Sequence, residues 1–179
     1  MYNLIFRGPA YGSSGYATAA RNFLLNLHST GDYHIVLDAL PWISGFSISE
    51  SKEILLLLKE METNRSLSED TTLLHWTVGS EFKGNLGCQR AIGHTIFETS
   101  SLNRSFVEGC NTMDAIMVPT EFNQQTFRQA GVKKPIFIVP EGVNTERFNP
   151  EGSTLSVIPS KFTFLSVANL SYRKGVDLI

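Results

Sequence analysis

The stretch from residue 113 to residue 150 constrains the fold most, because it reads as a strand, a helix and a strand joined by short turns. Thr120 can cap the helix with its hydroxyl, and Gly131 suits a left-handed helix end. Residues 135–139 form a β-rich apolar run that should be buried. Because a helix joins the two strands, we expect them to be parallel.

Ligands of open parallel sheets bind beyond the carboxyl ends of the strands. The turn Pro-Glu-Gly-Val-Asn follows the second strand of this unit. We therefore expect its residues Glu141 and Gly142 to lie beside a cleft.

The same alternation of strands and helices precedes this unit, which predicts an α/β fold with a doubly wound, Rossmann-like parallel sheet. We expect one helix to begin near Tyr16 and a second to contain the apolar stripe at residues 54–61. A third helix should begin after a cap at Ser100 or Ser101. The expected strands are residues 2–7, 34–40, 72–78, 90–97, 114–118 and 135–139, followed by a further strand at 162–168.

Composition narrows the functional classes. The net charge of −2 provides no basic field for nucleic acid, and 42% hydrophobic residues suit a sizeable core. The two cysteines form neither a disulfide framework nor a zinc motif, which favours a reduced, cytoplasmic setting. We expect no signal peptide and no membrane-spanning segment, although peripheral membrane contact stays open.

The loop at residues 8–15 follows the first strand and opens a helix, where backbone N–H groups suit a phosphate. Its glycine spacing is neither the dinucleotide fingerprint nor a P-loop. A simple tight turn is equally consistent with it. Asp38 ends the second strand, where dinucleotide-binding folds place a ribose-binding acid, so a nicotinamide reading stays open.

Two further groups of polar residues could serve a site. Glu98 and Thr99 follow the fourth strand at the expected cleft rim, where a carboxylate can accept hydrogen bonds from sugar hydroxyls. Alternatively, Glu98 forms an ion pair or caps the next helix. Arg173 and Lys174 follow the last strand and could neutralise a diphosphate, although such pairs are usually solvated.

Five ordered segments carry a resemblance. They are GSSGYATAARN, HTIFETSSL, MDAIMVPTEFNQQTF, IFIVPEGVNTERFNP and FTFLSVANLSYRKGVDLI. The chain resembles retaining glycosyltransferases of the GT-B fold, in their large group-1 (family 4) class. The resemblance implies that residues 1–150 form the acceptor-side domain, residues 151–161 the interdomain linker and residues 162–179 the start of the donor domain. We expect the sequence to be a fragment that is inactive alone.

The resemblance also implies roles for individual residues. A nucleotide sugar is the expected donor, without a metal or other cofactor, and the expected acceptor is a glycan, a lipid or a small molecule. Glu98 stands where many members carry a histidine near the reacting sugar. The residues expected to contact the donor diphosphate are Gly12, Ser13, Ser14, Gly15, Arg173 and Lys174, and those expected along the cleft are Tyr16, Thr99, Glu141 and Gly142.

Acceptor specificity should depend on the irregular loops at residues 41–49 and 79–87. Two alternative functions remain open. One is a non-catalytic carbohydrate-binding module that uses the same cleft, and the other is a dinucleotide-dependent oxidoreductase domain.

Overall fold

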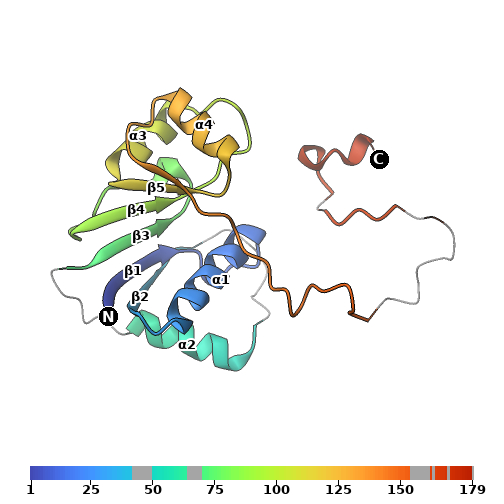
Figure 1. Cartoon of the computed structure of the whole chain (residues 1–179), viewed down its shortest axis with the longest axis horizontal. Coiled ribbons are helices and arrows are strands. Elements are labelled where there is room, and N and C mark those ends of the chain that lie inside the picture. The colour runs from blue at the N-terminus through green and yellow to red at the C-terminus, as the bar shows by residue number, and fades with distance from the viewer. Residues whose placement is uncertain (42–49, 64–69, 154–161, 163, 169, 179) are drawn as a thin grey trace. The chain divides into compact units, whose positions relative to one another are not determined.

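The computed structural model describes residues 1–41, 50–63, 70–153, 162, 164–168 and 170–178 (Figure 1). The chain divides into two compact units, Met1–Glu141 and Gly142–Ile179. The domain boundary at residue 150 stays a prediction. Most of the expected linker, residues 154–161, lies outside the described residues.

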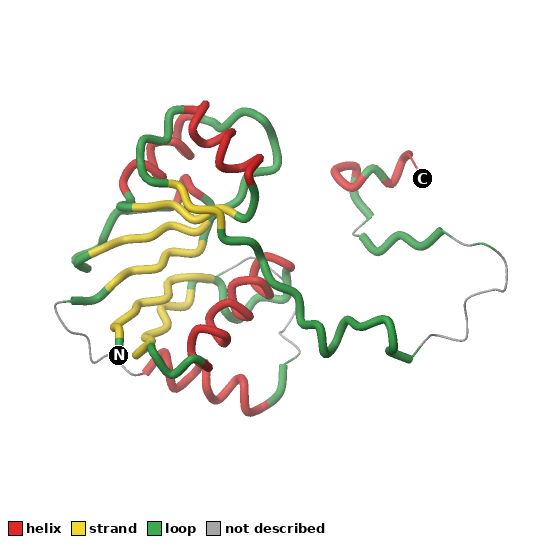
Figure 2. The backbone as a smooth tube through the Cα atoms, in the orientation of Figure 1, coloured by secondary structure: helices red, strands yellow, loops and turns green. Residues whose placement is uncertain are grey.

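The described part of the first unit contains a six-stranded parallel sheet in the order β2-β1-β3-β4-β5-β6 (Figure 2). The prediction of an α/β, Rossmann-like doubly wound fold is therefore confirmed. The strands are β1 (Tyr2–Gly8), β2 (Tyr33–Ala39), β3 (Thr72–Trp76), β4 (Arg90–His94), β5 (Ala115–Val118) and β6 (Ile136–Ile138).

Helices cover both faces of the sheet, because the strands alternate side chains between two apolar clusters. One cluster joins Phe6 and Leu74 of the sheet to Leu24 of α1 (Gly15–Ser29) and Leu58 of α2 (Lys52–Thr63). On the other face, α3 (Arg104–Thr112) and α4 (Glu121–Ala130) pack over the sheet, contributing the buried Phe106 and Phe127. In Figure 1, α1 and α2 accordingly lie apart from α3 and α4.

The strand order reverses between β1 and β3, which makes the carboxyl ends of these strands the topological switch point. Gly8 ends β1 and allows a close approach there, since a Cβ atom at Gly8 would lie 3.0 Å from the Cβ of Trp76, the last residue of β3. The loop at residues 8–15 thus leaves the sheet where open α/β folds bind ligands.

The ends of the helices follow local chemistry, with one exception. Thr120 caps α4 by accepting a hydrogen bond from the Asn123 N–H, and Gly131 ends it in the left-handed region with φ of 102°, so both predictions are confirmed. The predicted Ser100 or Ser101 cap of α3 is wrong. Asn103 holds that place, because its side-chain oxygen accepts a hydrogen bond from the Phe106 N–H at 2.9 Å.

Three strand predictions are corrected. The expected burial of residues 135–139 holds only for Ile136, since β6 is the edge strand, Pro135 is exposed and Phe137 is 57% exposed. The fourth strand ends at His94 and not near residue 97. Residues 162 and 164–168 form no strand.

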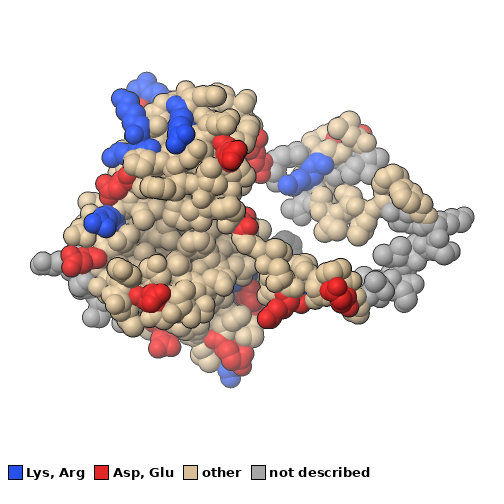
Figure 3. Space-filling model, in the orientation of Figure 1, with Lys and Arg blue, Asp and Glu red and all other residues tan. Residues whose placement is uncertain are grey.

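The surface carries charges of both signs. On the face shown in Figure 3, basic side chains gather over the part of the sheet near α3 and α4, and acidic side chains are spread across the face. Within the described residues, no helix is both long enough and apolar enough to cross a membrane.

Candidate functional site

The start of α1 forms the first part of the site. Ser14 caps this helix, and its hydroxyl accepts a hydrogen bond from the Ala17 N–H at 3.2 Å. Gly15 is exposed, and a Cβ atom built on it would meet no protein atom within 4 Å. Neither crowding nor a positive φ requires glycine at this position. The open space above Gly15 would let a ligand reach the N-terminus of the helix.

A buried arginine holds this loop. Arg21 lies on the inner face of α1 with a side chain only 4% exposed. One terminal nitrogen, Nη1, donates to the carbonyl oxygens of Ala10 and Gly12, each at 3.0 Å. Nη2 lies 2.7 Å from Glu50 Oε1, so the buried charge is paired. Arg21 therefore ties the loop of β1 to α1 and to the segment before α2.

Tyr16 connects α1 with the ends of two other strands. Its ring packs edge-on against Trp76, with centroids 6.4 Å apart. Burial raises the pKa of the Tyr16 hydroxyl, the Thr95 hydroxyl opposes that shift by hydrogen bonding, and the charge of Glu141 adds to it. The Tyr16 hydroxyl is therefore neutral at pH 7.

Beneath Tyr16, Trp76 and His94 stack at the ends of β3 and β4 with ring centroids 3.5 Å apart. Both side chains are 1% exposed, so both belong to the core. Burial lowers the pKa of His94 from 6.5 to about 4. The imidazole is thus neutral at pH 7, and its Nδ1 atom meets no partner in the described part of the chain.

We expect this buried histidine to make the protein acid-sensitive. The folded state resists protonation down to about pH 4, whereas the unfolded chain takes up the proton near pH 6.5. The free energy of unfolding should therefore fall by about 2 kcal/mol between pH 7 and pH 5 for His94 alone. Urea titrations at both pH values measure this loss.

His94→Phe keeps a ring against Trp76 and removes the titrating group, so the loss of stability between pH 7 and pH 5 should shrink by about 2 kcal/mol. The part of the loss that comes from the similarly buried His75 should remain. His28→Phe, in the last turn of α1, is the matched control, and it should keep the dependence because His94 remains. An equally steep loss in His94→Phe would contradict this origin.

Glu98 and Thr99 lie exposed after β4. The segment is anchored by Asn123 of α4, whose Nδ2 donates to the carbonyl oxygen of Phe97 at 2.6 Å. The Thr99 hydroxyl donates to the Ser101 carbonyl oxygen at 3.2 Å. The structure therefore fixes the backbone before Glu98 to the start of α4.

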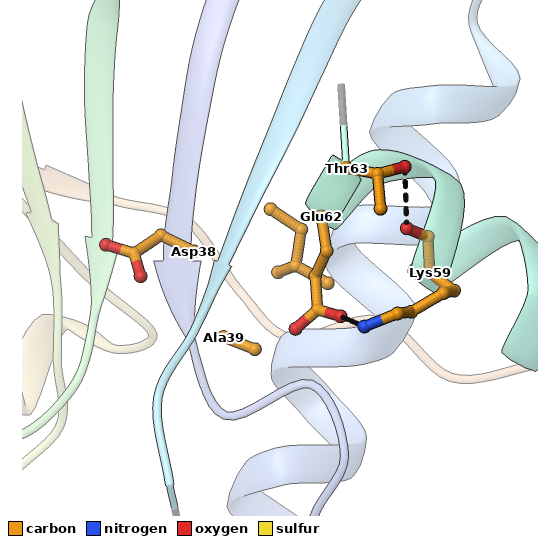
Figure 4. Close-up of a pocket in the computed structure, with 6 residues that line it drawn as sticks. Asp38, Ala39, Lys59, Glu62 and Thr63 are labelled. Carbon is orange, nitrogen blue, oxygen red and sulfur yellow. Dashed lines mark hydrogen bonds and ion pairs between the residues drawn. The ribbon is translucent and has the colours of Figure 1, made fainter. Parts of the chain in front are cut away.

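Asp38 is engaged within the protein. Its carboxylate forms an ion pair with Arg7 on the neighbouring strand. Figure 4 shows the Asp38 carboxylate pointing away from Lys59 and Glu62, which pair at 3.0 Å in a pocket of about 430 Å³ between β2 and α2. The ribose-binding role considered for Asp38 would require this pair to open.

Three of the predicted site residues, Gly142, Arg173 and Lys174, belong to the second unit. Gly142 is exposed, and a Cβ atom there would meet nothing within 4 Å. Lys174 is exposed at the end of η2 (Tyr172–Lys174), which Gly175 follows with φ of 68°. The Arg173 side chain lies outside the described set. Their participation in a site with the loop of α1 stays a prediction.

Sequence reasoning missed Arg21 and Asn123, each 3% exposed. A signal existed for Arg21, because it falls on the buried stripe with Ala17, Ala20 and Leu24. Such a charge must be paired when buried. Asn123 carried no comparable signal, since its partner Phe97 is 26 residues away along the chain.

Within the described ranges, no three His, Cys, Asp or Glu side chains gather as they would to hold a metal ion. Comparison of the chain with family models, curated proteins and solved structures found no match.

Proposed function

We propose that this chain is the acceptor-side part of a retaining glycosyltransferase that uses a nucleotide sugar. The observation that carries the proposal is the open N-terminus of α1 at the topological switch point, with free space above Gly15 and a loop tied down by Arg21. The ordered motifs of the sequence agree with this geometry.

In the proposed reaction, the bond between the sugar and the donor diphosphate breaks, and the acceptor hydroxyl bonds to the same face of the sugar. Negative charge grows on the departing diphosphate. Backbone N–H groups at the start of α1 and the Lys174 ammonium would stabilise that charge. Glu98 would accept hydrogen bonds from the reacting sugar at the cleft rim.

The test is donor turnover by the protein in its full natural length. Each common nucleotide sugar is supplied, and released nucleotide and transferred sugar are quantified together. Turnover of one donor with retained anomeric configuration supports the proposal, and no binding or turnover of any of them contradicts it.

Removal of the Lys174 ammonium should weaken donor binding. In the natural-length protein, Lys174→Ala should cost ~1–3 kcal/mol of donor affinity, the range for a hydrogen bond to a charged group. Calorimetry with the donor measures the change. Lys133→Ala removes another exposed lysine and should leave the affinity unchanged. Equal affinities of the two variants would contradict the diphosphate role of Lys174.

A further inference from the structure

A second pocket, of about 650 Å³, opens at the carboxyl ends of β1, β2 and β3. This volume falls within the range of about 300–1,000 Å³ that is typical of small-molecule pockets. Leu40 and Pro41 give it an apolar wall, and the turn after β3 contributes Glu81 and Lys83. These residues belong to, or adjoin, the two loops expected to set acceptor specificity, of which residues 42–49 lie outside the described set.

The inner wall is a row of polar side chains across three strands. Asp38, Arg7 and His75 are register partners on β2, β1 and β3, so their side chains project from the same face of the sheet. Asp38 pairs with Arg7, and the His75 ring packs against Phe82 with centroids 5.3 Å apart. The row is therefore held in place before any ligand arrives.

Two atoms of this row have unused hydrogen-bonding capacity. His75 is 2% exposed, and neither its Nδ1 nor the buried Nε of Arg7 meets a partner among the described residues. Burial, with the charges of Arg7 and Lys83 partly offset by Asp38, lowers the pKa of His75 to about 4. The imidazole is neutral at pH 7, so its Nδ1 atom can either accept or donate one hydrogen bond, depending on the tautomer.

The balance of charge and polarity indicates the class of ligand. The charge of Arg7 is balanced by Asp38. The pocket is also lined by one acidic residue, Glu81, and one further basic residue, Lys83. An anionic ligand would therefore meet carboxylates as well as cations. A lipid chain would leave the buried nitrogens unpaired, which is costly. Sugar hydroxyls both donate and accept, and the C–H face of a sugar ring can pack on Leu40 and Pro41.

We propose that this pocket binds one uncharged, hydroxyl-rich sugar ring, held by Arg7, His75 and Glu81. Its role as the acceptor rests on the glycosyltransferase activity proposed above, whereas sugar binding itself does not.

The direct test follows the His75 imidazole by ¹⁵N NMR in the chain of residues 1–179, whose four histidines give a tractable spectrum. His75→Gln assigns the signal. The probes are glucose, galactose, mannose, maltose, cellobiose and lactose at millimolar concentration, with glucose 1-phosphate and a short-chain phosphatidylglycerol as competing ligand classes. A saturable shift of the His75 signal by a neutral sugar is expected. No shift with any of them, or a stronger response to either anionic probe, overturns the proposal.

Glu81→Gln removes an exposed carboxylate and should lower the affinity for the sugar about tenfold. Glu60→Gln, at an exposed position of α2 outside the pocket, is the matched control and should bind normally. Equal affinities of the two variants would overturn the role of Glu81.

The natural-length enzyme separates the two proposals. Donor turnover with an acceptor KM that Glu81→Gln leaves unchanged overturns the pocket as acceptor site but not the transferase activity. Sugar binding at His75 without turnover of any donor overturns the transferase activity and leaves a carbohydrate-binding site.

Discussion

Arg21→Met should lower the free energy of unfolding by about 3–5 kcal/mol, the range for breaking a buried ion pair from one side. The substitution leaves the Glu50 carboxylate without its partner and frees the carbonyl oxygens of Ala10 and Gly12. Because these carbonyls belong to the loop before α1, the same variant should also weaken any ligand bound at Gly15. Urea unfolding at pH 7 measures the stability.

The matched control for Arg21→Met is Arg104→Met. Arg104 also pairs with a glutamate, Glu108 at 2.7 Å, but its side chain is 91% exposed. Water replaces the lost contact at such a site, so the unfolding free energy should hardly change. If both variants unfolded at the same urea concentration as the unchanged protein, the anchoring role of Arg21 would be wrong.

Gly109→Ala should destabilise the protein by about 3 kcal/mol or more, at the upper end of overpacking effects. A Cβ atom on Gly109 would lie 2.0 Å from the carbonyl oxygen of Gly79, which is backbone and cannot rotate away. Since α3 packs directly on η1 (Gly79–Glu81), the two elements would have to separate. Thermal unfolding followed by circular dichroism measures the effect.

Gly15→Ala is the opposite case for stability. A Cβ atom at Gly15 meets open space, and alanine restricts the unfolded chain, so the variant should be as stable as the unchanged protein or more so by about 0.4–1 kcal/mol. A bound phosphate would nevertheless meet the new methyl group.

A stable Gly109→Ala protein would show that α3 and η1 are not in this close contact.

The local patterns of the sequence predicted most elements of the first unit well. Strand alternation, the Thr120 cap and the Gly131 stop depend on residues within a few positions of each other, and the structure has all of them. The prediction failed for the strand at 162–168, because an apolar run specifies a strand only where a neighbouring strand pairs with it.

The sequence by itself determined the alternation of strands and helices, and with it the parallel sheet and the loop that follows β1. The tertiary structure alone decided which side chains meet at the site. Arg7 pairs with Asp38 from 31 residues away, and Arg21 reaches Glu50 across 29 residues. Strand register sets the first pair, and the packing of α1 beside the segment before α2 sets the second, and no local pattern encodes either. Because Arg21 is buried, its charge depends on the paired carboxylate of Glu50. His75 and Arg7 each keep a polar atom without a partner among the described residues, and we propose that a ligand uses these atoms.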